Sequence, residues 1–220
     1  MIISIDNLNA GINWWRSRSK SKFPLDFHNA DYDKIYKARD RIYEDRAEGD
    51  KDPWDLWWEA TVDRLGQWKA YRGPIPPNKK SEISKAGTER LPKIAAQYAK
   101  LAASPDTEPC IETMCWQDIG NLYALVSEIK PKSPVFASKT CHFLFPKLFI
   151  VMDNTATTVS DYELYWRGMQ DEWYRLEDKE KAEARNLLTN TIISSGKPLH
   201  PKYPLVTKIL ELCHIGHKPR

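Results

Sequence analysis

Two charged side chains stand out in this sequence because apolar residues surround them. Lys139 lies within the apolar stretch Phe136 to Phe145, and Asp153 directly follows the apolar run Leu148 to Met152. Lysine and aspartate are seldom fully buried unless they are paired or used chemically. A desolvated lysine can become a neutral amine that attacks a sugar or carbonyl carbon, and a nearby carboxylate can accept its proton. The pattern predicts a nucleophilic site within Ser133 to Asn154.

This stretch resembles the helix-hairpin-helix DNA glycosylases, and among them the 8-oxoguanine DNA glycosylases. In that family a small residue and the catalytic lysine open an apolar helix, and a catalytic aspartate begins the next segment. Ser138-Lys139 followed by Thr140 to Phe145 matches the lysine part, and Phe149 to Asp153 matches the approach to the aspartate. The resemblance implies that Lys139 is the Schiff-base nucleophile at C1′ and that Asp153 activates it. It also implies an all-α fold and double-stranded DNA with a flipped base as the partner.

The likeness is specific over this stretch alone, and the chain departs from the family pattern elsewhere. Pro134-Val135-Phe136-Ala137 stands where the family has a glycine-rich hairpin. No N-terminal β-lobe and no four-cysteine iron–sulfur pattern is predicted. The resemblance therefore implies a pared-down, atypical member.

Further candidate DNA-binding residues lie at the N-terminus and beside the two charges. Trp14 and Trp15 precede a run of cations alternating with serines, Arg16, Arg18, Lys20 and Lys22. In an extended chain these cations would share one face, with aromatic rings for bases and charges for phosphates. The alternative is a solvated arm whose tryptophans fold back onto the core. Ser138, His142 and Asn154 flank the two charges; for His142 a hydrogen-bonded core histidine is the alternative.

Composition narrows the class of protein. The 220 residues include 41% hydrophobic residues, enough for a core, and a net charge of +3 that is compatible with nucleic acid without requiring it. Four cysteines without a paired framework or a preceding signal peptide indicate reduced thiols and a cytoplasmic protein. No Walker A loop, G-x-G-x-x-G or G-x-S-x-G pattern is present, which disfavours nucleotide hydrolysis, Rossmann cofactors and α/β-hydrolase chemistry. Cys213 to His217 resembles half a zinc site without a second half, so we expect a helix end there.

Helical periodicity dominates the chain and predicts one all-α domain, 1–220, of about nine helices. A Gly/Pro-rich linker makes 73–80 a candidate sub-lobe boundary. Asp52 and Ser133 are expected N-caps, each followed by proline. The expected helices are Asp31 to Ala47, Trp54 to Tyr71, 81–102 with a break at Gly87 or Pro92, 108–129, Phe136 to Phe145, Asp161 to Trp173, Leu176 to Asn190 and Leu205 to Leu212.

Together with the resemblance, these observations predict a monomeric DNA glycosylase that excises a modified base without a metal or cofactor. A lyase activity that cleaves the strand is compatible with the same residues. By analogy alone, the base could be a phage modification and the role antiviral defence. The alternatives are a non-catalytic all-α nucleic-acid-binding protein and a helical interaction protein whose aromatic residues are all core.

Overall fold

The computed structural model describes residues 1–19, 24–43, 52–71, 77–103, 108–152 and 160–217. Helices make up most of this part of the chain, which contains no strand, so the predicted all-α class is confirmed. The α-helices are α1 (Ile5–Ser19), α2 (Tyr32–Tyr43), α3 (Pro53–Gln67), α4 (Pro77–Thr88), α5 (Leu91–Ala102), α6 (Trp116–Ser127), α7 (Pro134–Leu144), α8 (Tyr162–Arg175), α9 (Asp178–Ile193) and α10 (Leu205–His217), with a short 3-10 helix η1 (Asn29–Asp31) before α2.

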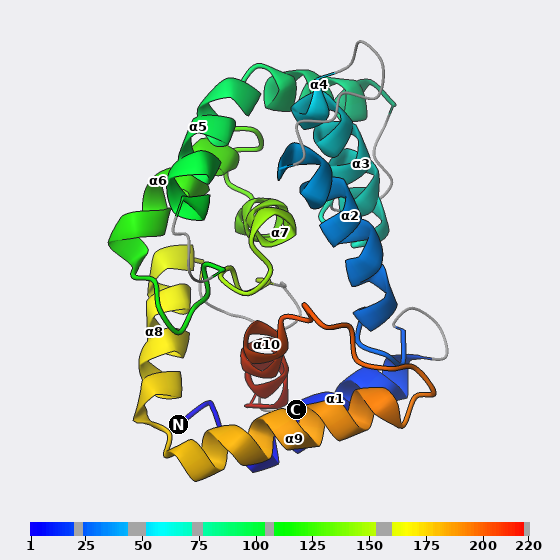
Figure 1. Ribbon diagram of the computed structural model, residues 1–220, viewed down its shortest axis with the longest axis vertical. Coiled ribbons are helices and arrows are strands. Elements are labelled where there is room, and N and C mark those ends of the chain that lie inside the picture. The colour runs from blue at the N-terminus through cyan, green and yellow to red at the C-terminus, as the bar shows by residue number, and fades with distance from the viewer. Residues whose placement is uncertain (20–23, 44–51, 72–76, 104–107, 153–159, 218–220) are drawn as a thin grey trace.

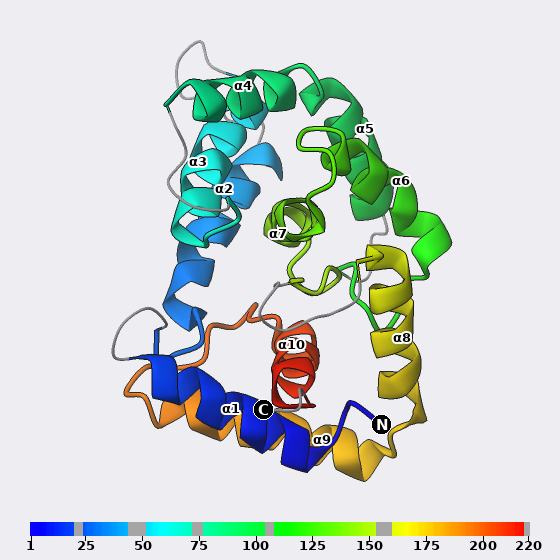
Figure 2. The same cartoon turned by 180° about the vertical axis from the view of Figure 1, so that it is seen from behind.

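The helices are arranged around α7, which lies near the centre of the molecule (Figure 1). Helices α2 to α6 and α8 form a rim around it, and α1 and α9 cross the end where α10 lies (Figure 2). Every residue of α7 from Val135 to Leu144 is buried. A helix that is buried on all sides is usually apolar all round. Four polar residues of α7 therefore each need a partner inside the protein: Ser138, Lys139, Thr140 and His142.

Local signals explain where several helices begin. The Asp52 carboxylate accepts a hydrogen bond from the Trp54 amide, with Pro53 at the first helical position, as predicted. Ser133 occupies the N-cap position of α7 before Pro134, although its side chain makes no capping hydrogen bond. The predicted helix 81–102 is interrupted between Thr88 and Leu91. The predicted helix 108–129 begins only at Trp116, because the residues before it form a turn.

The cation run that begins at Arg16 was expected in an extended chain, and for its described part this expectation is wrong because residues 5–19 form α1. Leu8, Ile12 and Trp15 recur at helical spacing and are all buried, so α1 gains more from packing this face than an arm would. Two residues apart on a helix, Arg16 and Arg18 point about 200° away from each other rather than to one side.

Two glycines let α1 pack directly against α10. A Cβ atom on Gly11 would overlap the main-chain carbonyl of Leu212, and one on Gly216 would overlap the carbonyl of Asn7. The two backbones therefore approach too closely for any side chain at these positions. This packing carries Trp15 into the interior, beside α10.

The sub-lobe boundary predicted near 73–80 falls partly outside the described residues. Residues 77–80 form the beginning of α4. Buried hydrophobic residues from every part of the described chain, from Ile3 to Ile215, belong to one core cluster.

Candidate functional site

Lys139 is buried, with 4% of its surface exposed. Its Nζ donates a hydrogen bond to the main-chain carbonyl of Trp68 at 2.6 Å. Trp68 is the C-cap of α3, and the last carbonyls of a helix carry partial negative charge that favours a nearby cation. The predicted lysine is thus an interior amine held at the C-terminal end of α3.

The end of α3 has the geometry needed to present that carbonyl. The helix stops at Gln67 because Lys69 adopts a left-handed conformation, with φ of 52°. The Ala70 amide then bonds to the Leu65 carbonyl and the Lys69 amide to the Gly66 carbonyl, which is a Schellman arrangement. Glycine usually occupies the left-handed position, so the sequence carries no clear stop signal there, and the predicted helix to Tyr71 was too long.

The run Leu148 to Met152 is buried but belongs to no helix or strand. Buried main-chain groups need hydrogen-bond partners, and here side chains supply them. Trp166 Nε1 donates to the Leu148 carbonyl at 2.9 Å, and the Tyr162 hydroxyl donates to the Ile150 carbonyl at 2.7 Å. The Met152 amide donates to Ser138 Oγ at 3.1 Å. The chain that leads to Asp153 is thereby tied to the residue preceding Lys139. Asp153 and Asn154 themselves lie outside the described residues.

His142 also holds the segment Leu148 to Met152 in place. Its Nδ1 lies 2.7 Å from the Phe149 carbonyl oxygen, and its Nε2 lies 2.6 Å from the Tyr32 hydroxyl. Since a carbonyl can only accept, Nδ1 carries the proton and Nε2 accepts from Tyr32. Burial lowers the pKa of His142 to about 3. Both ring nitrogens are engaged, so this arrangement leaves none for the substrate contact that was expected; the core alternative describes His142 better.

The predicted N-terminal DNA-binding residues are divided by the fold. Trp15 is buried, its Nε1 donates to the Pro24 carbonyl at 2.8 Å, and its ring stacks on Phe27 at 5.6 Å. Arg16 and Arg18 are exposed, and the Arg18 guanidinium lies 4.6 Å from the centre of the half-buried Trp14 ring. Lys20 lies outside the described residues. As packed here, the Trp15 ring cannot stack on a base, whereas the two arginines lie at the surface.

Sequence reasoning missed a buried ion pair on α10. Lys208 Nζ lies 2.5 Å from Glu211 Oε2, and the two side chains are 1% and 7% exposed. The Lys208 ammonium also lies 5.2 Å from the centre of the Trp15 ring, a cation–π contact. The sequence could have indicated this ion pair, because the two charges are three residues apart within a mainly apolar helix.

It also missed His28, whose ring packs on Trp68 with 4.5 Å between ring centres. His28 and the preceding Phe27 both have left-handed backbones, with φ of 67° and 51°. Such a conformation costs roughly 1–2 kcal/mol per residue outside glycine. Trp68 therefore touches both Lys139, through its carbonyl, and His28, through its ring.

No protein-family model, curated protein or solved structure matches this chain. Within the described ranges, no group of three or more histidine, cysteine or acidic residues could hold a metal ion. No helix in the described part of the chain is long and apolar enough to cross a membrane.

Proposed function

We propose that this protein is a DNA glycosylase that removes a modified base from DNA, with Lys139 as the attacking amine. The observation that carries the proposal is the burial of Lys139 beside a chain segment that leads to a carboxylate. Burying the charge of a lysine is costly unless the charge is paired or the group is used chemically. The Ser138 hydrogen bond to Met152 supports the pairing of Lys139 with Asp153 that the resemblance to glycosylases implies.

The proposed reaction is a displacement at C1′ of the deoxyribose. The neutral amine of Lys139 forms a bond to C1′ while the bond from C1′ to the base nitrogen breaks, and the base leaves with the electron pair of that bond. Asp153 accepts the proton that Lys139 must lose beforehand, and its negative charge favours the oxocarbenium character of the transition state. Loss of a further proton from nitrogen and opening of the sugar give a Schiff base, which supports strand cleavage as a second activity.

The experiment measures base release from duplex DNA. The protein is incubated with unmodified duplexes and with duplexes carrying oxidised, alkylated or phage-type modified bases, and alkali then cleaves abasic sites. We expect breaks on one modified duplex and a covalent adduct when borohydride is present. Lys139→Met should remove both signals, with base release reduced at least ~10²-fold, and Asp153→Asn should reduce base release strongly.

Lys93→Met is the matched control, because Lys93 is an exposed lysine on α5 and its loss should leave base release unchanged. Breaks that survive Lys139→Met would assign the activation of water to another group. Absence of breaks on every duplex would refute the glycosylase; salt-dependent DNA binding would then support the non-catalytic binding protein. Action on modified phage DNA in antiviral defence is the role that we propose by analogy, and the phage-type duplexes test its chemical basis.

A further inference from the structure

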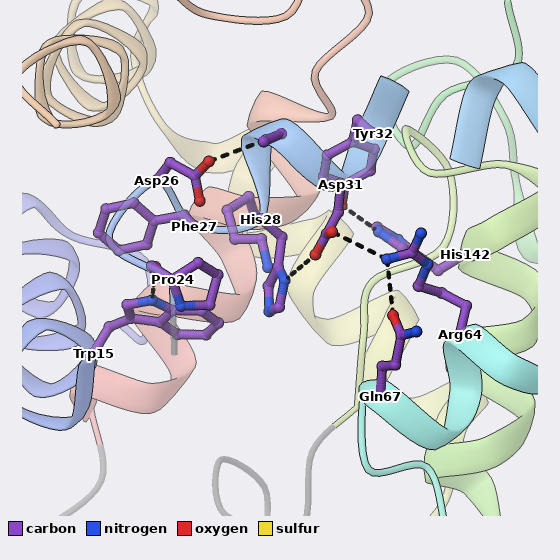
Figure 3. A network of polar contacts seen from close by, with 12 residues as sticks. Trp15, Pro24, Asp26, Phe27, His28, Asp31, Tyr32, Arg64, Gln67 and His142 are labelled. Carbon is purple, nitrogen blue, oxygen red and sulfur yellow. Dashed lines mark hydrogen bonds and ion pairs between the residues drawn. The ribbon is translucent and has the colours of Figure 1, made fainter. Parts of the chain in front are cut away.

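A chain of polar contacts holds the His28 ring in place (Figure 3). Arg64 of α3 donates to Gln67 and to Asp31 Oδ1, each at 3.0 Å. The other oxygen of Asp31, Oδ2, lies 2.7 Å from His28 Nδ1. The carboxylate can only accept, so Nδ1 carries the proton and Nε2 bears a lone pair. This is the arrangement in which a carboxylate orients an imidazole for use at its other nitrogen.

The free nitrogen of that imidazole is an acceptor without a donor. In the part of the chain that the structure describes, nothing donates to Nε2 of His28, and 17% of the side chain is exposed. Burial lowers the pKa of His28, while the hydrogen bond from His28 lowers that of Asp31. Near neutral pH the pair is thus a neutral imidazole and a carboxylate.

The backbone is bent to place this ring. Phe27 and His28 are consecutive left-handed residues, an unusual conformation for side chains of this size. It is held by the Tyr203 hydroxyl, which donates to the Phe27 carbonyl at 3.0 Å, and by the Asp31 amide, which donates to the His28 carbonyl at 2.8 Å. Strained residues that the surrounding structure enforces tend to occur at functional sites.

The His28 ring and Lys139 contact different groups of the same residue, Trp68. The centre of the His28 ring lies 4.5 Å from that of the Trp68 ring and 5.5 Å from that of the Trp15 ring. The carbonyl of the same Trp68 accepts the hydrogen bond from Lys139. Two independent features, the oriented acceptor and the strained backbone, therefore lie next to Trp68, the residue whose carbonyl holds the proposed nucleophile.

We infer that His28 is a further substrate-binding residue of the Lys139 site. Its Nε2 accepts a hydrogen bond from an N–H or O–H group of the nucleotide that Lys139 attacks, and Asp31 acts as the residue that positions it. This inference rests on the proposed function and adds a specificity contact to it. No bond breaks in the contact, so it needs no further reactant.

Two substitutions separate this role from a structural one. His28→Asn retains a donor close to the position of Nδ1 and tolerates the left-handed backbone, but it has no acceptor at the position of Nε2. His28→Gln can place an acceptor there. On the modified duplex that wild type cleaves, we expect His28→Asn to lower kcat/KM about tenfold and His28→Gln to recover part of the loss. Both should keep the urea midpoint of wild type to within a small shift.

The pH profile supplies a readout that a structural role would not move. Charged and titratable groups acting on His28 are Asp31, Lys208 and Glu211; Arg64 and Lys34 act on Asp31, and His142 lies close enough to feel His28. Protonation of Nε2 removes the acceptor, so kcat/KM of wild type should fall on acidification, at a pH below the ordinary range of histidine because burial lowers the pKa of His28. This acidic limb should be absent in His28→Asn.

The outcomes distinguish this inference from the proposed function. If His28→Asn keeps wild-type kcat/KM while Lys139→Met is inactive, the inference is overturned and the glycosylase stands. If wild type releases no base, diethyl pyrocarbonate labelling with peptide mass mapping tests whether His28 contacts DNA. If unmodified duplex DNA suppresses the labelling of His28, His28 is kept as a nucleic-acid contact. If His28 is not labelled, or is labelled equally with and without DNA, the inference is refuted.

Discussion

Acidification should destabilise this protein through His142, and the size of the effect follows from the burial of that ring. The pKa of His142 is about 3 in the folded protein, against 6.5 for an unperturbed histidine. Above about pH 6.5 the ring is neutral in both the folded and the unfolded states, so His142 does not make the free energy of unfolding depend on pH. Below it, the unfolded chain binds a proton that the folded protein excludes, so the free energy of unfolding falls by about 1.4 kcal/mol per pH unit. Between about pH 6.5 and about pH 4.5 the loss should approach 3 kcal/mol.

The assay is urea denaturation followed by tryptophan fluorescence at several pH values across this window. His28, whose pKa is also lowered, contributes in the same direction, and so do carboxylates near the acid end. These groups are common to wild type and His142→Gln, so the difference between the two proteins isolates His142. We expect a markedly shallower dependence on pH in His142→Gln, whatever its stability at neutral pH.

The same substitution at His217, an exposed histidine at the end of α10, controls for the loss of a histidine as such. Parallel curves for wild type and His142→Gln would refute the reasoning. They would mean that His142 can take up a proton in the folded state, and hence that its bonds to Tyr32 and Phe149 do not hold it neutral.

Three further predictions concern packing, charge and capping, each measured as the free energy of unfolding in urea. Gly11→Ala should cost at least ~1–3 kcal/mol because its Cβ would overlap main chain of α10, whereas Gly168→Ala, with nothing within 4 Å, should be neutral or stabilising by up to ~1 kcal/mol; equal effects would contradict the close packing. Lys208→Met should cost ~3–5 kcal/mol by leaving a buried carboxylate unpaired, and adding Glu211→Leu should recover most of this loss. A negligible cost of Lys208→Met would mean that the pair is not buried in solution. Asp52→Ala should cost ~1 kcal/mol through the lost N-cap of α3, and no change would mean that water replaces the cap.

The sequence alone determined the all-α class, the N-cap at Asp52 and the buried helix that carries Lys139. These features depend on residues close together in the chain: a repeat of apolar side chains, a capping carboxylate and a proline at the first helical position. The same local signals failed for α1, where a conspicuous alternation of cations hid the weaker helical repeat of Leu8, Ile12 and Trp15.

The tertiary structure decided which groups meet. Trp68 and Lys139 are 71 residues apart, and Tyr32 and His142 are 110 apart, so no periodicity relates them. The Trp68 carbonyl is free to accept from Lys139 because α3 ends there in a left-handed residue other than glycine. The His28 ring is oriented by contacts from η1, α3 and the segment before α10. Hydrogen bonds to buried main-chain groups have no sequence signature, because any donor that the fold brings within reach can make them.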